Sequence, residues 1–229
     1  MNLHYQYYWF KEVIPHDVCD KIIKMGNEQI ELVKKEGGDA SGTTRGGGGK
    51  IKDDKRVSAK ELTPKEQNGG DYYARDCQVA WFNNQWLYDL VWPYLLEANR
   101  ESGWNWDIEW AEGFQFTKYT KGQFYDWHCD SWDKPYDKPN TPDHGKIRKL
   151  SMTCQLTDGS EYKGGELEFD FRNYDPHMRD ESKHRVQCKE ILPKGSIIVF
   201  PSFVWHRVKP VTSGTRYSLV VWHLGRPFK

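Results

Sequence analysis

The stretch Phe124-Tyr-Asp-Trp-His-Cys-Asp130 carries the most informative pattern of the chain. Its aromatic residues favour a β-strand, and residues two apart in a strand project to the same face. His128 and Asp130 therefore share one face, while Cys129 points to the other. A neutral imidazole and a carboxylate on one face form half of a metal site, so a distant strand should supply the remaining ligand.

His206 is the best candidate for that ligand. It lies in Pro201-Ser-Phe-Val-Trp-His-Arg-Val208, after an expected strand at 196–200 and before an expected turn at Val211 to Gly214. Two His and one carboxylate occupy one face of an octahedral ion and leave three positions open, as in the facial triad of non-haem Fe(II) sites. A structural zinc site would close its coordination with four protein ligands, and no fourth ligand stands out.

A second charged pattern follows ten residues after His206. In a strand, the sequence Gly214-Thr-Arg-Tyr-Ser-Leu-Val-Val-Trp222 places Arg216, Ser218 and Trp222 on one face. An Arg and a Ser in a barrel interior would be costly without an anionic partner. The distal carboxylate of 2-oxoglutarate suits this partner, because a guanidinium can grip it with two parallel hydrogen bonds. The alternative is a strand-end Arg that extends into solvent.

Outward from these motifs, the patterns predict a mostly β fold with supporting helices. Helices are expected at 16–35 and 85–100, where apolar residues recur at helical spacing. Strands are expected at 5–13, 72–82, 112–119, 124–130, 149–156, 165–171, 188–192, 196–200, 205–208 and 215–224. Two helices followed by about eight short strands predict a double-stranded β-helix, the cupin-like jelly roll, with its core at 108–225. The length of 229 residues favours one domain over 1–229.

The segment 37–70 differs from the rest of the chain. It is rich in glycine and charge and has almost no large apolar residue, so it cannot build its own core. Two interpretations stay open for this segment: a flexible surface loop, or a lid over the site.

Composition excludes several function classes. Lys and Arg together number 33, as do Asp and Glu, and this balance argues against a nucleic-acid binder. Five scattered cysteines without a C-x-x-C pair do not form a disulfide framework. Neither a signal peptide nor an apolar run of membrane-spanning length is visible. The expected location is the cytoplasm, with no membrane partner.

Five collinear motifs resemble the 2-oxoglutarate/Fe(II) dioxygenase superfamily. The resemblance is to the prolyl 4-hydroxylase-like branch, and within it to compact microbial and phage members. It covers most of 112–225, roughly half of the chain. The segments that carry it are Tyr119–Asp130, Arg148–Leu156, Tyr162–Leu167, Leu192–Pro201 and His206–Arg216.

The resemblance implies a role for individual residues. The implied iron ligands are His128, Asp130 and His206. Arg216 is implied to bind the C5 carboxylate of 2-oxoglutarate, with Ser218 nearby and Tyr119 hydrogen-bonded to this co-substrate. Gln155 stands where hypoxia-type prolyl hydroxylases have a Tyr, and an amide is expected to substitute for it. The positions implied to line the substrate pocket are Tyr125, Arg148 and Trp222, each with a structural role in a strand as the alternative.

The resemblance also implies a reaction in which 2-oxoglutarate yields succinate and CO2 while a substrate C–H is hydroxylated, with ascorbate as a candidate reductant. The first expected substrate is a prolyl residue in a protein or peptide, and the second is a free amino acid or other small molecule. Nucleobase demethylation is less favoured, because those relatives carry a second Arg six residues after the one that matches Arg216, and this chain has Trp222 there. Two alternatives of another function class remain: a non-catalytic jelly-roll binding protein, and a zinc hydrolase with the same three ligands. The oligomeric state stays open.

Overall fold

The computed structural model describes residues 5–42, 44–47, 51–52, 55–56, 71–131, 134–172, 175–177 and 182–228. Its main sheet has seven strands, in the order β1 (Tyr8–Phe10), β14 (Ile197–Pro201), β10 (Ile147–Gln155), β17 (Arg216–Gly225), β8 (Phe114–Tyr119) and β6 (Gln78–Phe82), with β7 (Trp110–Ala111) beside β17. A six-stranded sheet runs β13 (Arg185–Gln187), β12 (Leu167–Asp170), β15 (Trp205–Val208), β9 (Phe124–His128), β5 (Asp71–Asp76) and β2 (Thr44–Gly47).

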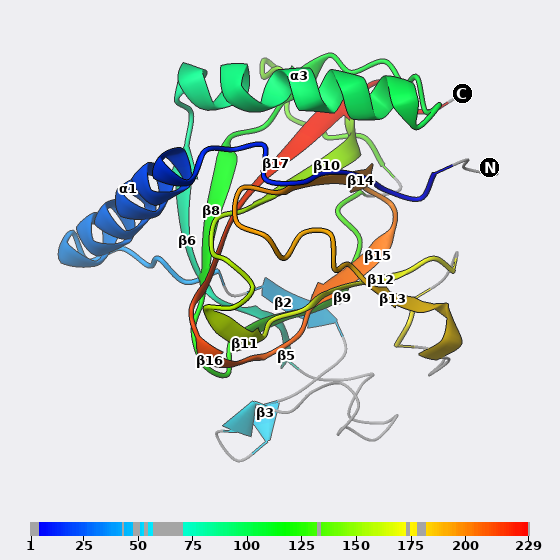
Figure 1. The fold of residues 1–229 in the computed structure, drawn as a ribbon. Coiled ribbons are helices and arrows are strands. Elements are labelled where there is room, and N and C mark those ends of the chain that lie inside the picture. Colours follow the sequence, from blue (N-terminus) through cyan, green and yellow to red (C-terminus); the bar gives the residue numbers. More distant parts are fainter. Residues whose placement is uncertain are drawn as a thin grey trace.

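The remaining described elements are short pairs and helices (Figure 1). The two-stranded pairs are β11 (Tyr162–Gly164) with β16 (Val211–Gly214), and β3 (Ile51–Lys52) with β4 (Lys55–Arg56). The helices are α1 (His16–Lys35), α3 (Gln85–Glu101) and the 3₁₀ turn η2 (Ser182–His184). This antiparallel arrangement confirms the predicted jelly roll with supporting helices.

The strands of the main sheet separate an apolar layer from a polar one. On β10, the side chains of Leu150 and Met152 pack in the core that the helices cover. The residues between and beyond them, Ser151 and Thr153, are buried on the opposite face, toward the six-stranded sheet. A second apolar cluster, which includes Phe169 and residues of β14 and β15, fills the space on that side. The site described below therefore lies between the two sheets.

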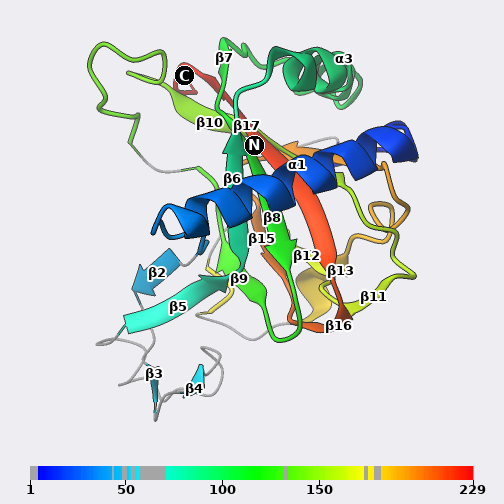
Figure 2. The ribbon, with the colours of Figure 1, turned by 90° about the vertical axis from the view of Figure 1, so that its left-hand side faces the viewer.

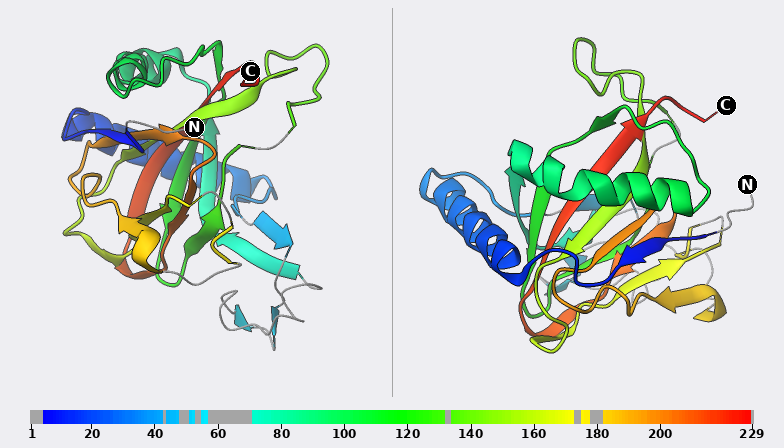
Figure 3. Two further views of the ribbon diagram at one scale, coloured as in Figure 1. Left: turned by 90° about the vertical axis from the view of Figure 1, so that its right-hand side faces the viewer. Right: turned by 45° about the horizontal axis from the view of Figure 1, so that its top comes forward.

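Helices α1 and α3 cover the outer face of the main sheet. Helix α1 crosses β6, β8 and β17 (Figure 2), and α3 lies across the other end of the same face (Figure 3). The buried residues of α1 recur every three or four positions, at Cys19, Ile22, Gly26 and Ile30. The same spacing in α3 buries one apolar stripe, formed by Leu87, Val91, Leu95 and Ala98.

Gly26 sets how closely α1 approaches the sheet. A Cβ atom at this position would lie 2.4 Å from ring atoms of the buried Phe116 on β8. We expect Gly26→Ala to lower the free energy of unfolding by about 1–3 kcal/mol through overpacking, although alanine favours a helix by about 1 kcal/mol. Urea unfolding measures this change. The exposed neighbour Glu28→Ala is the control, and a stabilised Gly26→Ala variant would contradict the close approach.

Three local predictions were wrong. The expected strand at 72–82 breaks at Cys77, where the chain leaves β5 in one sheet and enters β6 in the other. The expected turn at Val211 to Gly214 is β16, because it pairs with β11. The segment 188–192 is not a strand: Cys188 and Ile191 are buried in the second apolar cluster, but the segment belongs to none of the described strands.

Other predictions on the chain have different outcomes. Both predicted helices are confirmed, at 16–35 and at 85–101. Most of 37–70 lies outside the described residues, so the loop and lid interpretations stay predictions, as does the single domain over 1–229. Within the part of the chain that the structure describes, neither α1 nor α3 has the length and apolar composition that a membrane-crossing helix needs.

Candidate active site

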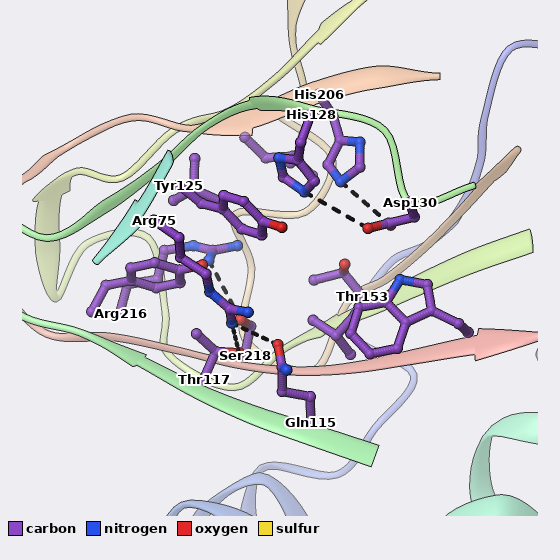
Figure 4. A pocket seen from close by; sticks show the side chains of 15 residues that line it. Arg75, Gln115, Thr117, Tyr125, His128, Asp130, Thr153, His206, Arg216 and Ser218 are labelled. Atoms are coloured by element: carbon purple, nitrogen blue, oxygen red, sulfur yellow. Dashed lines mark hydrogen bonds and ion pairs between the residues drawn. The ribbon is translucent and has the colours of Figure 1, made fainter. Parts of the chain in front are cut away.

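The pairing of β9 with β15 brings the two predicted histidine ligands together. These strands are antiparallel, with His128 directly opposite His206, and the centroids of the two rings are 4.1 Å apart. Asp130 follows β9 and turns its carboxylate toward both rings (Figure 4). One ligand atom from each of the three residues lies within 4.8 Å of the others. The backbone thus assembles two imidazoles and one carboxylate around a single point.

The hydrogen bonds of the two imidazoles determine which nitrogen is free. Nδ1 of His128 lies 2.7 Å from the carbonyl oxygen of Asp126, and Nδ1 of His206 lies 2.9 Å from that of Val204. A carbonyl only accepts, so each Nδ1 carries the hydrogen and each Nε2 keeps its lone pair. The Nε2 atoms face Asp130, at 3.7 Å for His128 and 3.5 Å for His206.

Burial and charge tune these groups for metal binding. Burial, helped by the neighbouring His206, holds the pKa of His128 well below its usual value and keeps the ring neutral. Burial opposes the charge of Asp130, but the two imidazoles, Arg148 and the Ser151 hydroxyl outweigh it and lower its pKa. Two imidazole nitrogen donors and one carboxylate oxygen donor fit a divalent iron ion with open positions.

Arg216 lies in the same cavity, on the inward face of β17. Only 1% of the residue is exposed. Its Nη1 donates a long hydrogen bond of 3.4 Å to Oγ of Ser218, while Nε and Nη2 are buried without a partner among the described residues. Unpaired buried donors on a cation are costly. The guanidinium is therefore ready to bind an anion, and it fits one carboxylate of 2-oxoglutarate.

The family comparison matches this part of the chain. Residues 114–224, which contain the triad and Arg216, match the model of the 2OG-Fe(II) oxygenase superfamily. The segment 114–224 thus belongs to the 2OG-Fe(II) oxygenase superfamily. The triad geometry and the two unpaired donor atoms of Arg216 agree with this membership.

Curated relatives of this oxygenase domain are PKHD-type hydroxylases. The protein from Synechococcus sp. (strain CC9902) is 38% identical over 101 residues, which cover 44% of this chain and 36% of that protein. The protein from Prochlorococcus marinus is 36% identical over 112 residues, covering 49% and 41%. The matched segment thus spans about two fifths of the length of these relatives.

Solved structures share the fold of the oxygenase domain. The viral collagen prolyl hydroxylase of Paramecium Bursaria Chlorella virus-1 superposes with a TM-score of 0.57 at 17% identity, covering 96% of this chain and 97% of that one. A prolyl-4-hydroxylase of Pseudomonas putida gives 0.55 at 16% identity, covering 97% and 94%. At these identities the likeness concerns the fold alone.

Four further residues predicted from the sequence line the cavity of the oxygenase domain: Tyr119, Tyr125, Ser218 and Trp222. Tyr125 stacks on His128, with ring centroids 3.4 Å apart and an interplanar angle of 7°. Tyr119 lies opposite Arg216 in the β8–β17 pair, and its ring centroid is 5.8 Å from the guanidinium carbon. The structure therefore brings these residues together around the triad and Arg216.

Two predicted residues lie outside the cavity lining of the oxygenase domain. The side-chain nitrogen of Gln155 donates to the carbonyl oxygen of Thr157 at 2.8 Å and to the hydroxyl of Tyr162 at 2.9 Å. Arg148 pairs with Glu112 and stacks on Trp222 at 3.8 Å. Their predicted roles toward co-substrate and substrate stay predictions, because the groups that would act are engaged within the protein.

Sequence analysis missed four polar residues that line the cavity: Arg75, Gln115, Thr117 and Thr153. Gln115 and Thr117 share the face of Tyr119 on β8, so alternation from Tyr119 would have found them. No sequence signal marks Arg75, because its position depends on the break at Cys77. Thr153 lies two residues before Gln155 on β10, so alternation from Gln155 would have found it.

Ser151 positions the carboxylate of the oxygenase triad. Its hydroxyl donates to Oδ2 of Asp130 at 2.7 Å and lies 2.9 Å from Oγ of Ser202. Groups that orient a metal ligand usually contribute about 10- to 100-fold to metal affinity. We expect Ser151→Ala to weaken Fe(II) binding within that range, as measured by anaerobic titration. Ser160→Ala, on an exposed turn, is the control, and unchanged affinity in Ser151→Ala would show that Asp130 is held without this bond.

Proposed function

We propose that this chain is an Fe(II)- and 2-oxoglutarate-dependent dioxygenase that hydroxylates a prolyl residue of a protein or peptide, with release of succinate and CO2. The observation that carries the reaction class is the shared cavity of the triad and Arg216. Three metal donors lie at one side, and a buried guanidinium with two unpaired donor atoms lies at the other. The prolyl substrate is inferred from the prolyl hydroxylases that share the fold.

The side chains have distinct roles in this proposal. His128, Asp130 and His206 would hold the iron through Nε2 atoms and a carboxylate oxygen, leaving three positions on the open side. Arg216, with Ser218, would bind the distal carboxylate of 2-oxoglutarate and so orient its other end toward the metal. The bound iron and co-substrate supply the oxidising chemistry. Tyr125 and Trp222 would exclude water from the space where a substrate C–H has to lie.

The experiment is a panel of proline-containing peptides, free amino acids and small metabolites. Each candidate is incubated with the enzyme, Fe(II), 2-oxoglutarate and ascorbate, and products are analysed for the mass of one added oxygen. Succinate is measured in parallel. We expect stoichiometric succinate with a hydroxylated prolyl peptide. Hydroxylation of a free amino acid alone would replace the prolyl-peptide assignment, and absence of both succinate and Fe(II)·2-oxoglutarate binding would overturn the reaction class.

Omission of ascorbate from the same assay tests its predicted role as reductant. The cytoplasmic location stays a prediction, and the five free thiols are compatible with a reducing compartment.

A further inference from the structure

A second arginine projects into the cavity from β5. Arg75 lies opposite Tyr125 in the β5–β9 pair and is 7% exposed. Its Nη2 donates to Oε1 of Gln115 at 2.6 Å and, more weakly, to Oγ1 of Thr117 at 3.4 Å. Its Nε lies 3.0 Å from Sγ of Cys77. Figure 4 shows this side chain reaching across the cavity toward β8.

Each of these contacts is to a neutral group. Among the described residues, no Asp or Glu forms an ion pair with Arg75. Burial raises the pKa of the Cys77 thiol, although Arg75 opposes this shift. The thiol is therefore protonated at neutral pH, and the amide and hydroxyl that accept from Arg75 are neutral, so these contacts do not balance its charge.

Among the described residues, the charges that line the cavity leave one positive charge in excess. Arg75 and Arg216 are cations, and Asp130 is the anion of the lining. Bound Fe(II) and the 2-oxoglutarate dianion would cancel each other, so the excess would remain in the loaded site. A buried unbalanced charge is strongly unfavourable. One further carboxylate would neutralise the site.

The stronger contact of Arg75 lies toward the metal side of the cavity. Its stronger acceptor, Gln115, lies opposite Val220, and its weaker acceptor, Thr117, lies opposite Ser218, which accepts from Arg216. Because the weaker contact brings Arg75 toward Arg216, the test below also measures the 2-oxoglutarate affinity of an Arg75 variant. On its other side, the guanidinium carbon is 4.7 Å from the centroid of the Tyr125 ring, which stacks on His128.

We propose that Arg75 binds a carboxylate of the substrate, so that this enzyme selects substrates with a negative charge close to the hydroxylated carbon. The proposal rests on the proposed function, because it takes the triad and Arg216 to be occupied by iron and 2-oxoglutarate. The carboxylate has two possible sources. It belongs either to the α-carboxylate of a free or C-terminal proline, or to an acidic side chain next to an internal proline.

The test measures binding in the absence of turnover. Under anaerobic conditions, the protein is first titrated with Fe(II) and 2-oxoglutarate alone, and failure at this step counts against the proposed function. The loaded protein is then titrated calorimetrically with two matched pairs of probes. The first pair is N-acetyl-proline and N-acetyl-prolinamide, and the second is the peptide amides acetyl-Glu-Pro-Gly and acetyl-Gln-Pro-Gly.

We expect wild-type protein to bind the acid of one pair about 10- to 100-fold more tightly than its neutral partner, as a charge-assisted hydrogen bond predicts. The pair that responds identifies the source of the carboxylate. Arg75→Gln should bind both members equally, while its 2-oxoglutarate affinity changes less than about threefold. Arg100→Gln, the same substitution on exposed α3, should keep the preference.

Three results would overturn the proposal. In the first, the loaded wild-type protein binds the acid and the neutral member of both pairs equally well. In the second, the Arg75→Gln variant keeps the preference for the acid. In the third, Arg75→Gln loses as much affinity for 2-oxoglutarate as Arg216→Gln does. The last result would assign Arg75 to the co-substrate. Gln115→Glu provides a second test, because it places a carboxylate beside Arg75. We expect this variant also to lose the preference for acids, and a retained preference would count against the proposal.

Discussion

His128→Ala and Asp130→Ala should each abolish substrate-dependent succinate formation. Either change removes one of the three proposed iron ligands, whose ligand atoms lie within 4.8 Å of one another. Loss of a group that merely orients a ligand lowers metal affinity about 10- to 100-fold, so loss of a ligand itself should exceed about 100-fold. Anaerobic Fe(II) titration and a succinate assay measure the two effects.

His144→Ala is the matched control for the ligand variants. This histidine is exposed and lies near Asp137, away from the cavity lining. We expect its iron affinity and succinate formation to equal those of the wild type. Wild-type turnover by His128→Ala or Asp130→Ala with iron still bound would refute the ligand assignment.

Arg216→Gln should weaken 2-oxoglutarate binding by about 150- to 5000-fold, because removal of one partner of a buried charge pair costs about 3–5 kcal/mol. Iron binding should persist, since the triad is intact. The effect on folding stability has the opposite direction. In the absence of co-substrate, the variant should be at least as stable as the wild type, because the substitution removes a buried cation with two unpaired donor atoms. Calorimetric titration and thermal unfolding measure these effects.

Two variants bracket this result. Ser218→Ala removes only the hydroxyl that accepts from Arg216 at 3.4 Å, so we expect a loss of about fivefold, near 1 kcal/mol. Arg226→Gln changes an arginine whose side chain is 83% exposed and should leave affinity unchanged. If Arg216→Gln binds 2-oxoglutarate like Arg226→Gln, the co-substrate carboxylate binds elsewhere.

Local chemistry in the sequence was sufficient for the helices, the jelly roll and the residues of the site that share a strand. Alternation places Arg216 beside Ser218 on β17, because a strand repeats every two residues. The expected strand 124–130 ends at His128, so Asp130 reaches the site from beyond the end of β9, where its backbone N–H donates to the carbonyl oxygen of Ser202. Helix α1 follows in the same way from apolar residues at helical spacing. Val211 to Gly214 resisted this approach, because pairing with a distant strand makes it β16.

The sequence by itself thus determined the chemical types of the site: two imidazoles, a carboxylate and a guanidinium. Only the tertiary structure decided that His128 stands opposite His206 and that Arg75 enters the same cavity. The physical reason is the range of the interactions. Side-chain alternation is a property of a few bonded neighbours, whereas the pairing of β9 with β15, and the passage from β5 to β6 between sheets, depend on how the whole core packs.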